Sequence, residues 1–259
     1  MTAHKSLCFT TLQGIPQIVP GDDLSNIILD ACNTNEIDIE NGDVFVLAQK
    51  IVSKAENRLV NLSTVRPTEK AIEMAAYLQK RPELVQLILD ESNEVLRTRP
   101  GTIIVEHKSG FVCANAGIDH SNVIGSWGEP QDWVLLLPED SDRSAQRILY
   151  ELQDKTGNEL GVLIIDSHGR AWRNGIVGVC IGVSGIPALV DMRGQKDMYD
   201  YALRVTTIAA ADELAAGASL MMGQANEGTP VVHVRGFPYG LRESSSRELI
   251  RERKNDLFR

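Results

Sequence analysis

The chain has 259 residues, of which 43% are hydrophobic and 24% are charged, as in an ordinary globular protein and unlike a disordered one. Its formal net charge of −9 argues against sequence-independent binding of nucleic acid, which needs a dense basic surface. The four cysteines lie far apart with no C-x-x-C pair, so we expect neither a disulfide scaffold nor a zinc knuckle, and reduced thiols fit best.

The sequence shows no targeting or membrane-spanning segment. Residues 1–12 lack the apolar core of a secretion signal. The longest weakly polar stretch, 176–190, is shorter than a membrane span and is interrupted by glycines. The sequence therefore predicts a cytoplasmic protein that has neither a membrane nor a nucleic acid as a partner.

The first predicted helix begins near Leu24, directly after Asp22 and Asp23. Carboxylates at such a position accept hydrogen bonds from the free amides of the first helical turn. They could instead bind a metal, but capping is the preferred interpretation. Capping also explains the carboxylates of residues 139–142, which precede another predicted helix, so we do not count them as a site.

The other predicted elements alternate without a regular βαβ rhythm. Strands are expected in apolar runs bounded by turn residues: 44–48, 102–106, 110–114, 134–137, 161–166 and 231–234. Helices are expected at 71–78, 84–89, 144–154, 206–222 and, as a solvated charged helix, in the tail 242–259. This mixture favours an α+β fold over a doubly wound sheet, in one domain spanning residues 1–259, with a division into two subdomains left open.

Two apolar segments lead into polar residues that can bind a metal. The run at 161–165 ends abruptly in Asp166, Ser167 and a glycine, and Asp119 follows the apolar residues 111–114. Carboxylate and hydroxyl oxygens at the rim of a sheet can share Mg²⁺ or Mn²⁺ with phosphates. The two segments together suggest a metal-nucleotide site. The alternative is that Asp119 and Asp166 merely cap turns at strand ends.

Common nucleotide-binding loops are absent from the sequence. The segment after Asp166 contains Gly175, Gly178, Gly182 and Gly185, but these form neither a P-loop nor a G-x-G-x-x-G fingerprint. Close packing of the backbone is sufficient to explain them.

Five short segments occur together in one order along the chain. They are Gly14-Ile15-Pro16, Ser53-Lys54-Ala55-Glu56, Asn115-Ala116-Gly117-Ile118-Asp119, Ile165-Asp166-Ser167-His168-Gly169-Arg170 and Met222-Gly223-Gln224. In this combination they resemble the coenzyme F420-0:L-glutamate ligase family, whose members use GTP to add glutamate to a deazaflavin coenzyme precursor. The resemblance extends over about residues 14–250. The ending, 237–243 through 256–259, is similar to that of bacterial members.

The resemblance implies an α+β fold with a mixed sheet, unrelated to ATP-grasp enzymes, in an intertwined homodimer. It implies GTP, two Mg²⁺ or Mn²⁺ ions per subunit, and K⁺ as a candidate activator. Asp119 and Asp166 match the ligands of one metal, and Ser167 and Gln224 match those of the second. The positions that match GTP contacts are Gly14, Ile15, Pro16, Gln17, Gln49, Lys50, Lys54, Asn122, Met222, Gly223, Gln224, Ala225, Asn226, Glu227, Gly228 and Thr229.

Three positions depart from what some relatives carry. Ser167 stands where they have threonine and keeps the hydroxyl, and Asn57 stands where they have glycine and tolerates a left-handed backbone. Gln224 stands where they have glutamate, and its neutral amide oxygen binds a divalent ion more weakly than a carboxylate does. The second metal would then depend mainly on phosphate ligands.

The implied reaction suggests roles for individual residues. GTP would phosphorylate a carboxylate, and the amine of glutamate would attack the acyl phosphate, while Asp119 and Asp166 hold metal and Lys54 acts as a point charge on the nucleotide. Arg170 and Arg173 could clamp the carboxylate or phosphodiester of the precursor, with surface salt bridges as the alternative. His120 and His168 adjoin the acidic residues and are expected to lie behind the ligands or to face solvent rather than to bind metal.

Two other functions remain open at this point. One is a regulatory module that binds GTP and metal without ligation. The other is ligase chemistry with a different acceptor or amino acid, because the matching residues mostly concern GTP and metal. The sequence determines neither the number of glutamates added nor a preference between Mg²⁺ and Mn²⁺.

Overall fold

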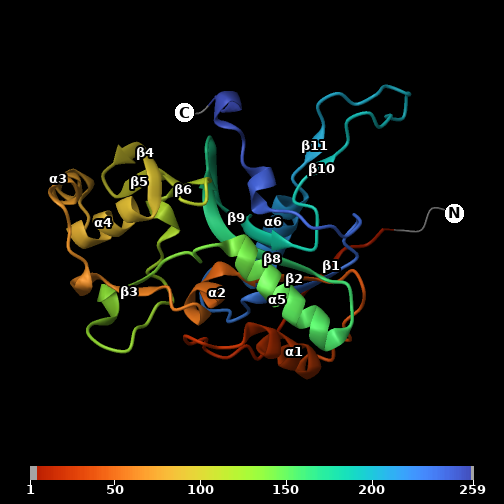
Figure 1. Ribbon diagram of the computed structural model, residues 1–259, viewed down its shortest axis with the longest axis horizontal. Helices are drawn as coiled ribbons and strands as arrows, with labels where there is room; N and C mark the ends of the chain where they lie inside the picture. Colours follow the sequence, from red (N-terminus) through yellow and green to blue (C-terminus); the bar gives the residue numbers. More distant parts are fainter. Residues whose placement is uncertain (1–4, 258–259) are drawn as a thin grey trace.

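The computed structural model describes residues 5–257, so the last two residues of the ending that resembles bacterial members, Phe258 and Arg259, lie outside it. At its centre is a five-stranded mixed sheet in the order β1-β12-β2-β8-β9 (Figure 1). The strands are β1 (Cys8–Thr11), β12 (Val231–Arg235), β2 (Val44–Ala48), β8 (Gly161–Arg170) and β9 (Arg173–Ser184). Only the pairing of β2 with β8 is parallel within this sheet.

Both faces of this sheet are buried, because side chains of a strand alternate between its faces. Phe45 and Leu47 of β2 pack with helices α1 (Leu24–Thr34) and α5 (Ser141–Thr156) on one face. Val44 and Val46 pack with α6 (Ala210–Met222) on the other. The continuous apolar run of β2 therefore follows from its position in the middle of the sheet.

A separate lobe carries its own core, at the left of Figure 1. It contains α3 (Glu69–Leu78), α4 (Pro82–Asp90) and the antiparallel sheet of β4 (Ser92–Arg99), β5 (Thr102–His107) and β6 (Val112–Ala114). The short helix α2 (Gln49–Ala55) leads from β2 to β3 (Leu59–Asn61), which pairs with β7 (Trp133–Leu135) between lobe and main sheet. Residues on both sides of this junction can therefore form a common site.

An arm extends from the body next to the edge of the main sheet (Figure 1). It begins and ends in the short paired strands β10 (Val190–Asp191) and β11 (Thr207–Ile208). Its outer part exposes apolar side chains, with Met198 91% and Val205 86% accessible to solvent. Exposed apolar side chains that lie together are common where proteins contact one another.

The free edge of β9 is protected by side chains rather than by another strand. Three of its backbone amides donate hydrogen bonds to the side chains of Ser219, Asp212 and Asp142, at 3.1, 2.9 and 2.9 Å. An unpaired row of amides would otherwise invite pairing with another chain. The hydrogen bond from Cys180 also holds the Asp212 side chain beside β9.

The structure confirms the α+β class, the mixed sheet and most of the predicted elements. Asp23 caps α1 by accepting a hydrogen bond from the Asn26 amide at 3.0 Å, and Asp140 caps α5 in the same way. Asn57 has φ 56°, in the left-handed region, as expected. Close packing is confirmed for Gly178, because a Cβ there would lie 2.6 Å from the Ala215 carbonyl oxygen.

Three predicted boundaries are wrong. The strand expected at 161–166 continues to Arg170, because pairing with β9 extends past Asp166 and forms a long hairpin. The helix expected from residue 206 begins at Ala210, because Thr207 pairs with β10. The strand expected at 134–137 covers Trp133–Leu135, because these are the residues that pair with β3.

The tail does not form the expected solvated helix. It contains 3₁₀ turns at Ser246–Leu249 and Arg253–Asn255. Asp142 accepts hydrogen bonds from the Ser245 hydroxyl and the Ser246 amide, which ties the tail to the body. Side-chain anchoring of this kind replaces the helical hydrogen bonds that its mixed charges suggested. Within residues 5–257, no helix combines the length and apolar character needed to cross a membrane.

A buried ion cluster lies at the start of β2. Asp43, 1% exposed, accepts hydrogen bonds from Arg235 at 2.9 and 2.7 Å and lies 2.8 Å from Nε2 of His233. Burial alone would raise the pKa of Asp43, but the hydrogen bonds from Arg235, the Glu40 amide and His233 hold it below its ordinary value. The cluster joins β2 to β12.

Replacing Asp43 with alanine is expected to lower the free energy of unfolding by about 2 kcal/mol, because the buried His233 ring and the Glu40 amide lose their hydrogen-bond acceptor. Since the folded pKa is lowered, this contribution is complete above the unfolded pKa of about 4 and is lost as pH falls through the folded pKa. Urea unfolding at neutral and acidic pH measures both effects. The control, Asp191→Ala, removes an exposed ion pair with Arg193 and should leave the midpoint unchanged. Equal midpoints for Asp43→Ala and the parent would contradict the expectation.

Candidate active site

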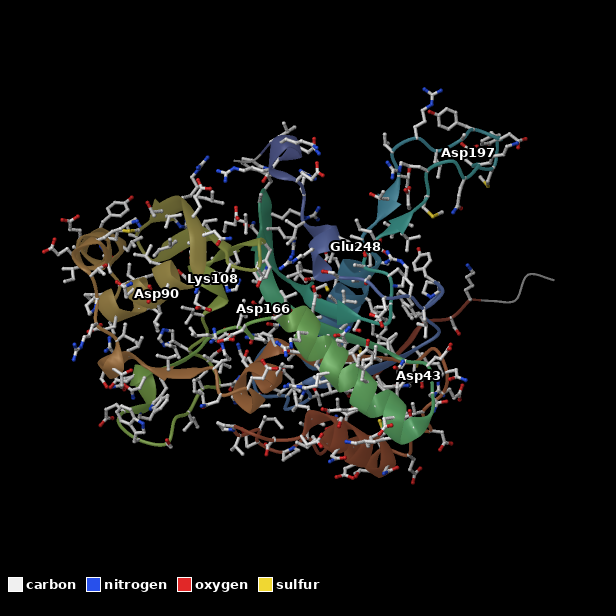
Figure 2. The ribbon with its side chains drawn as sticks, in the orientation of Figure 1. Asp43, Asp90, Lys108, Asp166, Asp197 and Glu248 are labelled. Atoms are coloured by element: carbon white, nitrogen blue, oxygen red, sulfur yellow. The ribbon has the colours of Figure 1, made fainter. Side chains whose placement is uncertain are left out.

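The parallel pairing of β2 and β8 brings the candidate residues together. Ala48, at the end of β2, lies opposite Ile165, so Gln49 and Asp166 follow at the same edge of the sheet. The Ala48 amide also donates a hydrogen bond to the Pro230 carbonyl at 2.8 Å. This bond brings the loop between α6 and β12, residues 223–230, to the same edge. Carboxyl ends of adjacent parallel strands are a common location for ligand sites. Figure 2 shows Asp166 near the middle of the molecule, beside the lobe that carries Lys108.

Asp119 reaches this edge from the side of the lobe. Its backbone forms a two-way bridge with Leu135, at 3.0 and 2.9 Å. Its Oδ2 atom accepts a hydrogen bond from Nε2 of Gln49 at 2.5 Å and forms an ion pair with Lys50. The Gln49 amide is fixed in turn, because its Oε1 accepts a hydrogen bond from the Ser53 hydroxyl at 2.8 Å. The carboxylate is therefore positioned by α2.

The two aspartates differ in their protonation behaviour. Burial raises the pKa of Asp119, and Asp166 raises it further, while Lys50 and Gln49 oppose the shift. Burial also acts on Asp166, but the hydrogen bond and charge of His168 hold its pKa below the ordinary value. Nε2 of His168 lies 3.0 Å from Oδ2 of Asp166. Asp119 and Asp166 are thus near enough to repel, and cations reduce that repulsion.

Ser167 and Gln224 form a second pair at the same edge. The Ser167 hydroxyl donates a hydrogen bond to Oε1 of Gln224 at 3.1 Å. Ser167 is the next residue of β8 after Asp166, and Gln224 follows α6. The structure therefore places Asp119 and Asp166 near enough to interact electrostatically and joins Ser167 to Gln224 by a hydrogen bond, with Asp166 and Ser167 adjacent on β8.

Two lysines make the edge cationic. Lys54 is half-buried, and no acidic side chain of the described residues forms a salt bridge with it. Burial and the neighbouring charge of Lys50 lower the pKa of Lys54. A buried cation without a partner is unfavourable, so an anion bound here would stabilise both lysines.

The loop after α6 presents its amides to a carboxylate. Oε2 of Glu227 accepts a hydrogen bond from the Ala225 amide at 2.8 Å. The amides of Ala225, Glu227 and Gln224 lower the pKa of Glu227. Asn122, with φ 57°, donates from its side chain to the Ala225 carbonyl at 3.1 Å. Thr229 closes the loop through a hydrogen bond to the Met222 carbonyl at 3.2 Å.

Other predicted residues lie farther from Asp166. Arg170 and Arg173 face each other across the turn of the β8–β9 hairpin and are exposed. Four residues of extended strand place Arg170 about 13 Å beyond Asp166. Residues 14–17 follow β1, and their loop reaches α2 where the Gly21 amide donates to the Ala55 carbonyl at 2.9 Å.

His168 lies behind Asp166, one of the two positions expected for it. Two residues near His168, Phe111 and Asp212, were not predicted from the sequence to lie close to the site. The centroid of the Phe111 ring lies 5.4 Å from that of His168. Asp212 gives no signal in the sequence, because an acidic residue in the first turn of a helix is ordinary. The pairing of β9 with β8 brings Asp212 towards His168, because Asp212 accepts a hydrogen bond from the Cys180 amide of β9, and no local signal records this.

The amino-acid sequence that forms this site matches a known family. The family model described as F420-0:Gamma-glutamyl ligase matches residues 14–236. The chain belongs to the F420-0:gamma-glutamyl ligase family. The family resemblance inferred from the sequence is thereby confirmed.

Relatives match this family member over nearly their whole length. A Methanothermobacter thermautotrophicus protein named Coenzyme F420:L-glutamate ligase is 44% identical over 250 residues, which are 96% of this chain and 97% of that protein. Proteins of the same name from Methanopyrus kandleri and Archaeoglobus fulgidus are each 41% identical, over 94% and 96% of this chain and 94% of each relative. The site residues described above therefore lie within the shared region.

The Lys50→Met variant should raise the pKa of Asp119 further in the protein without metal, because Lys50 favours the ionised carboxylate. A pH titration of the Asp119 carboxyl carbon by NMR measures the direction. Lys70→Met, on the exposed side of α3, is the matched control and should not change it. A pKa that stayed the same or fell in Lys50→Met would show that the ion pair is absent in solution.

Proposed function

We propose that the protein is a GTP-dependent ligase that adds L-glutamate to the lactyl carboxylate of coenzyme F420-0, and then γ-linked glutamates, releasing GDP and phosphate. The observation that carries the proposal is the convergence of two carboxylates and two lysines at one edge of the sheet, in a chain of this family. The names of its relatives support the acceptor and the amino acid.

The residues at the edge suit phosphoryl transfer to a carboxylate. Lys50 and Lys54 would neutralise phosphate charge, and the loop 222–229 with Asn122 would contact the nucleotide through its backbone amides. Gln49 would keep Asp119 oriented. These contributions are positioning and electrostatics rather than covalent catalysis.

The oxygen donors fit two Mg²⁺ or Mn²⁺ ions that also bind phosphates. Asp119 and Asp166 would hold one ion, and Ser167 and Gln224 would hold the other. Within residues 5–257, no group of three or more His, Cys, Asp or Glu side chains is arranged to hold a metal. Phosphate and water oxygens would therefore complete both coordination shells. When bound, the ions would neutralise the charge that develops on the transferred phosphoryl group.

The position of Arg170 and Arg173 suggests a role away from the transferred phosphoryl group. Both lie at the exposed hairpin tip, where guanidinium groups can pair with a phosphodiester. We assign them to binding the extended precursor.

The proposal is tested by incubating the protein with the deazaflavin precursor, L-glutamate, GTP and Mn²⁺, with mass spectrometry of the precursor and parallel measurement of GDP. Successive glutamyl additions matched by GDP are expected. Asp166→Ala should reduce the rate about 100-fold or more, because charge stabilisation at the phosphates is lost. Asp154→Ala, on the exposed side of α5, is the control and should retain the rate.

Each other outcome has a distinct meaning. GDP without glutamylation would indicate another acceptor or amino acid. Neither product, with GTP still bound, would indicate a regulatory nucleotide-binding module. Turnover by Asp166→Ala at the parent rate under saturating metal would overturn the metal assignment.

We also propose that the protein forms a homodimer through the arm between β10 and β11. The exposed side chains of Met198, Tyr199 and Val205 support this proposal, because a projecting apolar segment is stabilised when a partner covers it (Figure 2, where Asp197 labels the arm).

Charged residues on the arm should therefore abolish association. The double variant Met198→Glu and Val205→Glu is expected to be a monomer by light scattering coupled to size exclusion. The control, Leu220→Glu, changes a side chain of equal exposure on α6 and should keep the parent's state. A dimer that survived the double variant would exclude the arm as the interface.

A further inference from the structure

A cavity of about 240 Å³ is lined in part by His168, the residue that contacts the Asp166 carboxylate. Its walls come from four parts of the chain: the β5–β6 turn with Phe111, the β8–β9 hairpin with Cys180, the first turn of α6 with Asp212, and the tail with Arg251 and a second carboxylate, Asp256. It is smaller than the roughly 300–1,000 Å³ of pockets for drug-sized ligands, so it suits a small metabolite and not a deazaflavin or a nucleotide.

Asp212 brings an uncompensated negative charge to this cavity. Its Oδ1 atom accepts the hydrogen bond from the Cys180 amide, at 2.9 Å. Its Oδ2 atom has no hydrogen-bond partner among the residues of the described range, and no cation there forms a salt bridge with it. Burial raises the pKa of Asp212, although the Cys180 amide and the charge of His168 oppose this. A largely buried carboxylate in this state would be stabilised by a positively charged ligand group.

Arg251 brings a positive charge to the same cavity. Within residues 5–257 it has no salt-bridge partner. The tail that carries it is held in place, because Asp142 accepts hydrogen bonds from Ser245 and Ser246 and because Ile250 packs against Gly110. Asp212 and Arg251 thus bring charges of opposite sign to one cavity, and a ligand that is itself a zwitterion can pair with both.

The cavity adjoins the candidate active site. His168 lines it, and Nε2 of this residue lies 3.0 Å from Oδ2 of Asp166. A small molecule in the cavity would therefore lie one side chain away from the place proposed for phosphoryl transfer. Ligase chemistry needs its amine donor at that distance from the activated carboxylate.

We propose that this cavity binds the amino-acid substrate, L-glutamate, with its ammonium group on Asp212 and a carboxylate on Arg251. The inference rests on the proposed ligase function. It gives the tail a role, because the part of the chain beyond residue 236, where the family match ends, supplies one wall of the site.

The first test is the steady-state kinetics of Asp212→Asn, which keeps an acceptor for the Cys180 amide. We expect the KM for L-glutamate to rise about 10-fold or more, since a charged hydrogen bond is lost, with the KM for GTP within about twofold of the parent. Glu213→Gln removes the same charge from the adjacent, exposed position in the first turn of α6 and should change neither value. Arg251→Gln should also raise the KM for L-glutamate, and Arg247→Gln, in the same tail, should not.

The second test measures L-glutamate binding without turnover, by saturation-transfer NMR on the intact protein. Binding to the parent and to Glu213→Gln, but not to Asp212→Asn, supports the site, even if the parent makes no glutamylated product and the proposed function fails. Turnover by the parent with an unchanged KM for L-glutamate in Asp212→Asn would overturn the site while the function stands. A parent that shows no L-glutamate signal would also overturn it.

Discussion

The parallel pairing of β2 with β8 is the constraint on which the candidate site depends. It sets the end of β2 beside Ile165 of β8, more than a hundred residues away in sequence, so that α2 begins next to Asp166, where β8 continues beyond β2. The other pairings of the main sheet are antiparallel and cannot align two strand ends of the same kind. A shift of one residue in this register would turn Asp166 to the other face of the sheet. The apolar contacts of both faces of β2 and β8 fix the register.

Around that edge, acidic and basic side chains form ion pairs. Lys50 pairs with the carboxylate of Asp119, and His168 pairs with Asp166, while neither Lys54 nor Asp212 forms a salt bridge within the described part of the chain. An anion at Lys54 and a cation at Asp212 would complete these groups. In the proposed function the anion would be the nucleotide and the cation the ammonium group of the amino acid, and His168 would lie between them.

Much of the fold could be predicted because its signals are local. Asp23 before an apolar helical pattern, the apolar run of β2 and the left-handed Asn57 each report the conformation of their own segment. Asp119 and Asp166 could also be singled out, since a carboxylate at the end of an apolar run is visible in sequence. The end of β8, by contrast, was placed four residues too early, because its continuation depends on pairing with β9 and not on its own polarity.

The sequence by itself determined the family, the α+β class and the identity of the acidic and basic residues that gather at the sheet edge, because motif order and hydrophobic periodicity are properties of the chain. Only the tertiary structure decided which of these residues touch. It attached Lys50 and Gln49 to Asp119, moved Arg170 and Arg173 to a hairpin tip, and replaced a predicted helix in the tail by the wall of a cavity. Each of these outcomes depends on strand register and on side-chain hydrogen bonds between distant segments, and local sequence does not encode such contacts.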